Sequence, residues 1–246
     1  MLIDDQSGVA LAIPAIFGYS LAASLTVEEL DDKTLYISRI VSVLLLVAYS
    51  VFVWFQARTH HGIYDAIFEH DEQRDHDKHK DVDKPKLTLT ECVIALTISV
   101  TLVTFMAIYL VEQIHPIVMR HGVSDHFMGL ILVPLVEKAA EHLTAVDEAW
   151  DNQMNFALSH VLGATLQTAL LNGPLVVIVA WGLDKHMDIV FEVFDVVMLL
   201  LAILTVGNFL RDQKSNYLEG FLCVIVYISI AVAAFYYPNP ESEGEH

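Results

Sequence analysis

The sequence predicts an all-α membrane protein with about seven transmembrane helices. Hydrophobic residues make up 55% of the 246-residue chain, charged residues make up 18%, and the mean hydropathy is +0.51. A soluble globular domain is usually less apolar and more charged. The apolar residues also form blocks of about 20 residues, the length that a helix needs to cross the hydrocarbon core. These blocks lack the alternation of a membrane barrel, and isolated strands cannot satisfy their backbone in lipid, so helices are expected.

Seven apolar blocks are the expected spans. In chain order they are Ser7–Leu25, Tyr36–Ala57, Thr88–Val111, Phe127–Trp150, Phe156–Gly182, Ile189–Leu210 and Tyr217–Tyr237. Pro14 predicts a kink in the first span. Pro85 precedes the third span, and the residues after it make a good helix start.

The longest polar stretch, Arg58–Lys86, separates two expected spans from five. A helix around Tyr64–Arg74 is expected within it. The histidines of this loop could sense metal or pH, although a hydrated loop is the simpler interpretation; they are His70, His76 and His79. Three further histidines, near a turn on the opposite side, have the same simple interpretation: His115, His121 and His126.

Lysine and arginine are concentrated in two loops that seven spans place on the same side, Arg58–Lys86 and the loop with Arg211 and Lys214. Because positive residues favour the cytosolic side, the long acidic loop is expected in the cytosol. The acidic tail, Glu241–His246, then lies on the other side.

The net charge of −18 and the pI of about 4.8 argue against nucleic-acid binding, which needs a basic surface. Cys92 and Cys223 lie inside apolar segments, and their number and spacing form neither a disulfide framework nor a zinc pattern. The acidic start, Met1–Gln6, does not have the composition of a signal peptide. The chain enters its first span almost at once, so we expect a truncated protein.

The segment Leu130–Trp150 carries the chemistry. It is apolar enough to span a membrane, yet it holds six ionisable residues: Glu137, Lys138, Glu141, His142, Asp147 and Glu148. Each ionisable residue at mid-membrane costs about 2.5–3.5 kcal/mol on insertion scales. These side chains are therefore expected to line a protein interior or an aqueous cavity. The alternative is an interfacial helix, above all for Asp147 and Glu148 near its end.

Helical spacing places four polar side chains on one face of this span: Glu137, Glu141, Thr144 and Glu148. Two carboxylates one turn apart, Glu137 and Glu141, can attract a cation or share a proton. Lys138 and His142 form a neighbouring pair that would tune the selectivity and pKa of the site. This chemistry suits a site that holds either a metal ion or protons.

The next span contains Gly163 and Pro174, which can loosen a helix and release backbone carbonyls. Thr165 and Gln167 add the side-chain oxygens that hard cations prefer. The alternative interpretation is ordinary packing of small residues between membrane helices.

Several of these stretches together resemble the calcium/proton exchanger (CAX) family of the cation/calcium exchanger superfamily. Ala139–Val146 followed by Gly163–Gln167 looks like the second signature of that family. Ser38–His60 looks like its helix before the acidic loop, Asp212–Gly220 like its entry to the last helix, and Phe235–Pro238 like its usual end.

The resemblance implies the second half of an inverted-repeat cation exchanger that works by alternating access. It implies the last two helices of the first half at 1–57, an acidic cytosolic loop at 58–87, a repeat of five helices at 88–237 and a tail at 238–246. Glu141 would be the essential carboxylate for cation (metal) and proton, with Glu137, Thr165 and Gln167 as ligands or helpers. No cofactor is implied. The partners would be cations, protons, the bilayer, and a missing first repeat or a second protomer. A vacuolar membrane is the expected location, with another endomembrane as the alternative.

One departure from the family concerns selectivity. The family usually has Gly-Asn where this chain has Glu137 and Lys138, and the asparagine normally supplies a ligand oxygen. The pattern is similar to fungal-type vacuolar relatives that exchange Na⁺ or K⁺ for protons, with Ca²⁺ as a further possibility. The alternatives are a calcium/proton exchanger proper and a transport-inactive half that acts as a scaffold. An intramembrane metal-dependent hydrolase is a rival, but the sequence has no HExxH-type spacing.

Overall fold

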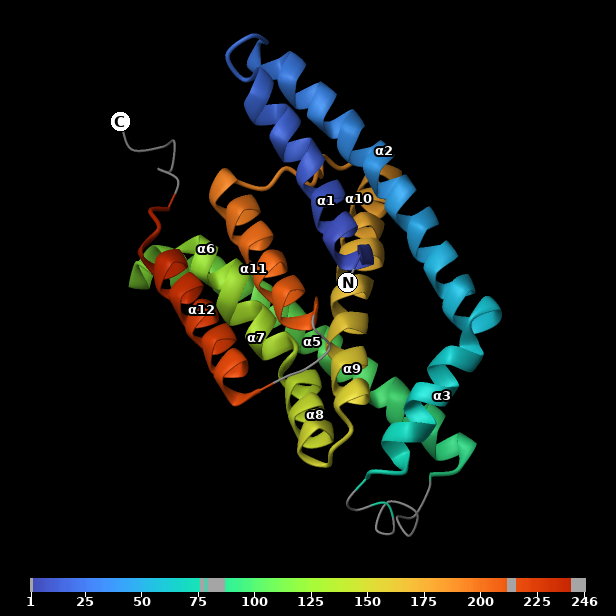
Figure 1. The fold of residues 1–246 in the computed structure, drawn as a ribbon. Coiled ribbons are helices and arrows are strands. Elements are labelled where there is room, and N and C mark those ends of the chain that lie inside the picture. The colour runs from blue at the N-terminus through green and yellow to red at the C-terminus, as the bar shows by residue number, and fades with distance from the viewer. Residues whose placement is uncertain (1, 76–77, 79–86, 212–215, 240–246) are drawn as a thin grey trace. The chain divides into compact units, whose positions relative to one another are not determined.

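The computed structural model describes residues 2–75, 78, 87–211 and 216–239 (Figure 1), and the regular elements in these ranges are all helical. The all-α fold class is therefore confirmed. In the list that follows, η marks a π-helical segment. The elements are α1 (Leu2–Leu21), α2 (Val27–Trp54), η1 (Phe55–Thr59), α3 (His61–Glu72), α5 (Leu89–His121), α6 (Asp125–Phe127), η2 (Met128–Leu132), α7 (Val133–Glu137), α8 (Ala139–Trp150), α9 (Met154–Gln167), η3 (Thr168–Asn172), α10 (Gly173–Gly182), α11 (Val193–Arg211) and α12 (Tyr217–Tyr236).

Five helices in the described ranges are long and apolar enough to cross a membrane. They are Val27–Thr59, Leu89–Arg120, Met154–Gly182, Val193–Arg211 and Tyr217–Tyr236. Each of them overlaps one of the seven expected spans. The first expected span is a shorter apolar helix, Ser7–Leu21, and the fourth, Phe127–Trp150, is divided among α6, η2, α7 and α8.

The chain divides into two compact units. Unit 1 comprises residues 1–74 and 140–228, and unit 2 comprises residues 75–139 and 229–246. Unit 1 contains α1 to α3, nearly all of α8, and α9 to α11. The fourth expected span is therefore shared between the units, because the boundary falls between Ala139 and Ala140.

Small residues allow the helices of unit 1 to approach closely. Ala12 and Ala15 of α1 are buried against Val196 of α11. A Cβ atom at Gly8 would meet Ile203 Cδ1, so a larger residue there would require the Ile203 side chain to move. Such contacts are how membrane helices pack without a hydrophobic driving force.

Helix starts follow the local sequence. Thr88 is the N-cap of α5, and its side chain and that of Glu91 form a capping box. Thr26 and Glu29 form the same arrangement before α2. The expected end of the third span at Val111 is wrong, because α5 continues for ten more residues to His121. His115 therefore lies inside this helix instead of near a turn.

Among the described residues, two of the π-helical segments end close to a proline that follows them. η2 ends two residues before Pro134, and η3 ends two residues before Pro174. Proline lacks an N–H group, and its ring meets the carbonyl of residue i−4. A wider π turn accommodates both effects, and π turns often occur at functional sites. The distortion expected around Gly163 and Pro174 is thus found at η3, whereas Gly163 lies inside regular α9.

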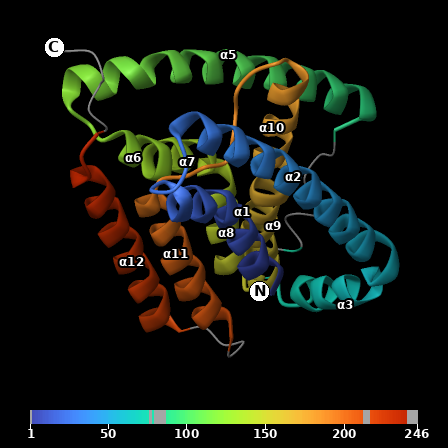
Figure 2. The ribbon, with the colours of Figure 1, turned by 90° about the horizontal axis from the view of Figure 1, so that it is seen from above.

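The polar stretch after α2 contains the expected helix as α3, which packs on α9 in unit 1. Figure 2 shows the chain turning sharply after α2, so that α3 runs back toward α9. Asp71 is buried at this contact. Its Oδ2 accepts hydrogen bonds from the backbone N–H of Asn155 at 2.8 Å and of Phe156 at 3.3 Å, and its Oδ1 accepts one from Asn155 Nδ2 at 2.8 Å. Asp71 thereby satisfies backbone donors that would otherwise lack a partner at the start of α9. Two of the histidines in this polar stretch, His76 and His79, lie outside the described residues.

In unit 2, residues near the C-terminal end of α12 pack against α6. The His126 and Tyr237 rings meet edge-on at 4.5 Å, and those of Phe127 and Phe235 at 5.3 Å. Asn239 Oδ1 accepts a hydrogen bond from the Asp125 N–H at 2.7 Å. His126 is therefore a buried packing residue, which favours its simple interpretation.

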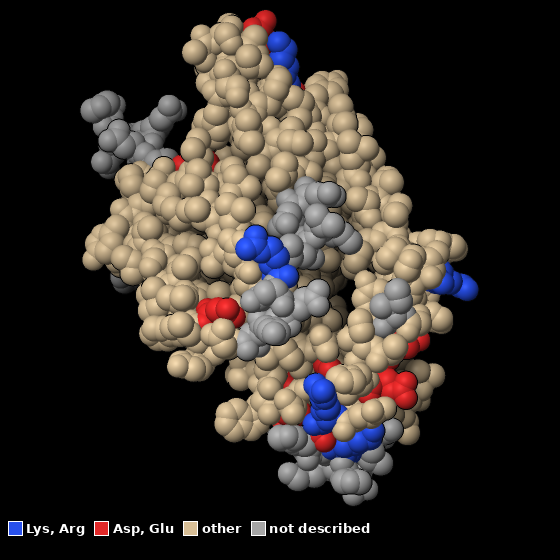
Figure 3. Space-filling model, in the orientation of Figure 1, with Lys and Arg blue, Asp and Glu red and all other residues tan. Residues whose placement is uncertain are grey.

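Most of the face in Figure 3 carries neither Lys or Arg nor Asp or Glu. Large apolar side chains are exposed along the long helices, such as Leu102, Val103 and Met106 of α5. An exposed apolar surface of this extent is what a helix that faces lipid requires. The surface therefore agrees with the membrane assignment made from hydropathy.

We predict that Asp71→Ala destabilises unit 1, because the start of α9 loses an acceptor that is buried and cannot be replaced by water. An unsatisfied buried donor costs about 1–3 kcal/mol, which corresponds to a fall in Tm of roughly 2–12 °C for a chain of this size. Thermal unfolding of the detergent-solubilised protein measures it. Asp65→Ala, an exposed position on the same helix, is the matched control. An equal Tm for the two variants would show that the Asp71 contacts do not stabilise the unit.

Candidate functional site

The helix that was expected to carry the site is interrupted in the middle of its charged segment. α7 ends at Glu137, Lys138 has φ −97° and ψ 14°, and α8 starts at Ala139. The expected face with Glu137, Glu141, Thr144 and Glu148 assumed one unbroken helix. Glu137 instead ends a helix of unit 2, and Glu141 lies in the first turn of a helix whose remainder belongs to unit 1. A carboxylate in the first turn is favourably placed toward the positive end of the helix dipole.

Unit 1 contains a cavity of about 750 Å³ that brings together two of the expected site residues, Glu141 of α8 and Gln167 of α9. Glu141 is half-buried. Polar groups from other elements of unit 1 share the lining, and they are Tyr49, Gln56, Tyr64, Asn155, Ser159 and His160. The rest of the wall is mostly apolar, with residues such as Phe52 and Leu166. The cavity thus offers carboxylate, amide and hydroxyl oxygens within an apolar surround.

Thr165 is not among the residues that line this cavity. Thr165 and Gln167 are two residues apart on a regular helix, which turns them about 200° from each other. The Thr165 hydroxyl donates to the carbonyl of Val161 at 3.0 Å, within its own helix. Of the two α9 residues, the structure therefore brings Gln167 to Glu141 in one cavity and leaves Thr165 outside its lining.

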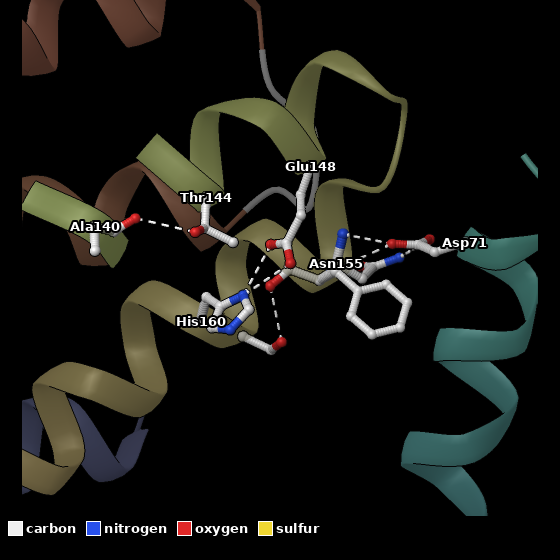
Figure 4. Close-up of polar contacts among 8 residues, drawn as sticks. Asp71, Ala140, Thr144, Glu148, Asn155 and His160 are labelled. Atoms are coloured by element: carbon white, nitrogen blue, oxygen red, sulfur yellow. Dashed lines mark hydrogen bonds and ion pairs between the residues drawn. The ribbon is translucent and has the colours of Figure 1, made fainter. Parts of the chain in front are cut away.

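Glu148 and His160 form a side-chain hydrogen bond across the α8–α9 turn. His160 Nδ1 lies 2.9 Å from both carboxylate oxygens of Glu148, and Figure 4 shows the two side chains pointing toward each other. His160 also lines the cavity, so an imidazole and its carboxylate partner stand at the wall that holds Glu141. Figure 4 also shows Thr144 bonded back to Ala140, within α8.

The two residues expected to tune the site have different surroundings. Lys138 Nζ lies 3.3 Å from Glu137 Oε1, so the ammonium is paired with the carboxylate beside it in unit 2. His142 is exposed on α8 and is not among the cavity-lining residues.

The cavity residues can bind a cation or a proton. A carboxylate and several neutral oxygens are the ligand types that Na⁺, K⁺ and Ca²⁺ use. A carboxylate and an imidazole are also groups that exchange protons. Since Glu141 and the Glu148–His160 pair share the cavity region, one site can hold either charge carrier.

Sequence reasoning gave no role to His160 and treated Asp71 as part of a hydrated loop. The contact of Glu148 with His160 depends on the turn at Asn152, whose φ of 72° reverses the chain between α8 and α9. The sequence offered one signal for this contact: Glu148 and His160 are 12 residues apart, on either side of a short polar turn. Asp71 and Asn155 are 84 residues apart, and the sequence carries no local signal of their contact.

The comparisons with known proteins agree on a family. The sequence profile described as "Sodium/calcium exchanger protein" matches residues 92–236. The vacuolar calcium ion transporter of Schizosaccharomyces pombe is 31% identical over 233 residues, 95% of this chain and 54% of that protein. The vacuolar cation/proton exchanger 2 of Arabidopsis thaliana is 28% identical over 236 residues, 96% of this chain and 52% of that protein. A Ca²⁺/H⁺ antiporter of Synechocystis is 31% identical over 237 residues, 94% of this chain and 62% of that protein.

The solved structure of native YfkE has the same fold, with a TM-score of 0.69 and 21% identity over 95% of this chain and 63% of that one. The chain spans about half the length of the first two of these relatives. The profile covers more than half of this chain and includes Glu141, Gln167 and the whole of α9. The chain therefore belongs to the sodium/calcium exchanger protein family, in its calcium/proton exchanger (CAX) branch.

Proposed function

We propose that this chain is the cation- and proton-binding half of a cation/proton antiporter that works by alternating access. The relatives are named as calcium transporters and cation/proton exchangers, which supports a transporter and not an enzyme. A first repeat or a second protomer would supply the other half of the site. In this proposal Glu141 holds the cation or the proton, and Gln167 contributes its amide oxygen.

The observation that carries this proposal is the shared cavity of Glu141 and Gln167. A carboxylate inside an apolar helix bundle is costly unless it faces water, a cation or a proton. Here it faces a cavity of about 750 Å³ with a second polar side chain from the neighbouring helix. A proton and a cation neutralise the same carboxylate, so they compete, and this competition is the basis of antiport. His160, hydrogen-bonded to Glu148, is a further group on the same wall that can exchange a proton.

For the transported ion we propose Na⁺ or K⁺ ahead of Ca²⁺. Glu137 and Lys138 form an ion pair with no net charge, at the place where the family usually has Gly-Asn. Lysine offers no oxygen to an ion, whereas Ca²⁺ needs six to eight oxygen ligands. The printed names of several relatives nevertheless specify calcium, so the calcium/proton exchanger remains the second candidate.

For the location we propose the vacuolar membrane, with the 58–87 loop facing the cytosol. Relatives from a yeast and a plant are named vacuolar, and the part of this chain that the structure describes has five helices long and apolar enough to span a bilayer. A proton gradient into an acidic vacuole would then drive cation uptake.

We predict that Glu141→Gln abolishes exchange in the complete protein, because an amide keeps the shape of the side chain but cannot alternate between proton and cation. The measurement is cation-dependent proton release from vesicles that carry the protein, and the expected rate is that of empty vesicles. Asp147→Asn, an exposed carboxylate on the same helix, is the control and should keep the wild-type rate.

Exchange at the wild-type rate in Glu141→Gln would remove Glu141 from this role. If the wild-type protein is folded but shows no cation-dependent proton release, the proposed antiport is wrong, and a transport-inactive scaffold becomes the favoured interpretation. The same assay therefore separates a wrong residue from a wrong function.

We predict that Lys138→Asn shifts selectivity toward Ca²⁺, because it leaves the charge of Glu137 uncompensated and adds an oxygen ligand. An extra negative charge attracts a divalent ion twice as strongly as a monovalent one. In water such a difference in charge interaction is worth about 0.5 kcal/mol, or about twofold in the ratio, and more where water is excluded. The measurement is the ratio of Ca²⁺- to Na⁺-dependent proton release, with the exposed Lys33→Asn as the charge-matched control. An unchanged ratio, or a wild type that already prefers Ca²⁺, would show that Lys138 does not set selectivity.

A further inference from the structure

A second cluster of metal-ligand side chains lies in unit 1, away from the cavity. Asp31 lies near the start of α2, and His186 and Asp188 lie in the connection between α10 and α11. One ligand atom from each residue lies within 4.8 Å of the others. His186 Nε2 is 3.0 Å from Asp31 Oδ2. Two segments about 155 residues apart in the chain thus bring together one imidazole and two carboxylates.

The connection that carries His186 and Asp188 is held against α1 and α2 by buried contacts. The backbone N–H of Ile189 donates to Ser38 Oγ of α2 at 3.3 Å, and both residues are buried. The next residue, Val190, packs against the Ala12–Val196 core. Asp188 is further oriented by a hydrogen bond that its Oδ1 accepts from the Val190 N–H at 3.1 Å. The backbone that carries His186 and Asp188 is therefore held in place by buried contacts with α1, α2 and α11.

The distances fit a bound metal ion with a small adjustment. Zinc–nitrogen and zinc–oxygen bonds are about 2.0–2.2 Å, so neighbouring ligand atoms around such an ion lie about 3.0–3.6 Å apart. The 3.0 Å separation of the His186 and Asp31 atoms already falls in this range. The outer limit of 4.8 Å must shrink by roughly 1.2–1.8 Å to reach the range set by these bond lengths. Rotation of the side chains allows this, since His186 and Asp31 are 51% and 56% exposed.

The donor set selects the class of ion. An imidazole nitrogen suits zinc and other transition metals, whereas Ca²⁺ and Mg²⁺ take oxygen ligands. Two carboxylates would balance the charge of a divalent ion, and water can complete the shell. Asp188 keeps a second carboxylate oxygen for an ion, because only its Oδ1 accepts the Val190 N–H.

The cluster is separate from the transport cavity. Asp31 lies 18 residues before Tyr49, the first α2 residue of the cavity lining. At 1.5 Å per residue this is about 27 Å along one helix. Charged side chains are also visible at the α1–α2 end in Figure 3, opposite to the end at which α3 follows. An ion at this place would not be the transported cation.

We propose that Asp31, His186 and Asp188 bind a divalent transition-metal ion of the zinc class. The bound ion fastens the α10–α11 connection to the start of α2. This site stands independently of the proposed antiport, because it shares no residue with the cavity.

The test is a titration of the purified, detergent-solubilised full chain with Zn²⁺ by calorimetry, after treatment with a chelator. Co²⁺ is the spectroscopic probe, because its visible absorption reports a nitrogen–oxygen ligand set. We expect one saturable site, and at least tenfold weaker binding in Asp31→Asn, His186→Gln and Asp188→Asn. The matched controls are Asp32→Asn and Asp184→Asn, which remove the same charge beside a ligand. The fold tolerates the second control well, because Asp184 has a φ of 52°, a region where asparagine is favoured.

Two measurements of Tm separate loss of metal binding from loss of folding. Wild-type Tm should rise on Zn²⁺ addition, and the Tm of the three ligand variants without metal should stay near that of the controls, which shows that they fold. The proposal is overturned if Zn²⁺ shows no saturable binding. It is equally overturned if binding is weakened as much by Asp32→Asn as by Asp31→Asn, or is unchanged in His186→Gln.

Discussion

The cost of placing ionisable side chains in an apolar helix bundle constrains the rest of this structure. Each such group costs about 2.5–3.5 kcal/mol near the centre of a membrane unless it is paired or hydrated. Lys138 is therefore paired with Glu137, and Glu148 with His160. Glu141 faces the cavity of unit 1. The polar groups of the bundle thus gather where protein, water or an ion can meet them, and the exposed helix faces stay apolar (Figure 3).

The helices that carry the charged segment and its neighbours are interrupted. An unbroken fourth span would have kept its charged residues on one long helix. The chain instead ends α7 at Glu137 and begins α8 at Ala139, which puts Glu141 in the first turn of α8, where the helix dipole favours a carboxylate. The π turns before Pro134 and Pro174 belong to the same pattern, because each shifts a helix just where a proline removes a backbone donor. In transporters, broken helices near the midplane are where ions bind.

Length and hydropathy were sufficient to predict the all-α membrane class and most of the long helices, because crossing a bilayer demands both. Thr88 could be placed as a helix start because capping is a local interaction. The break at Lys138 could not be predicted, because no glycine or proline stands there and the break depends on tertiary packing. Glu141 and Gln167 could be chosen from residue type. Thr165 was grouped with them, although positions two residues apart on a helix, such as Thr165 and Gln167, are turned about 200° from each other. Contacts between distant segments, such as Asp71 with α9, have no local signature.

The central claim is that Glu141 faces an aqueous cavity and not lipid, and thiol accessibility tests it most directly. In a background with Cys92→Ala and Cys223→Ala, Glu141→Cys would be compared with Leu143→Cys, whose native leucine is 72% exposed on the apolar face of α8. The measurement is the rate of modification by a charged, water-soluble thiol reagent in membranes. Glu141→Cys should be modified fast and Leu143→Cys slowly. Equal rates, or a faster reaction at Leu143→Cys, would contradict the central claim.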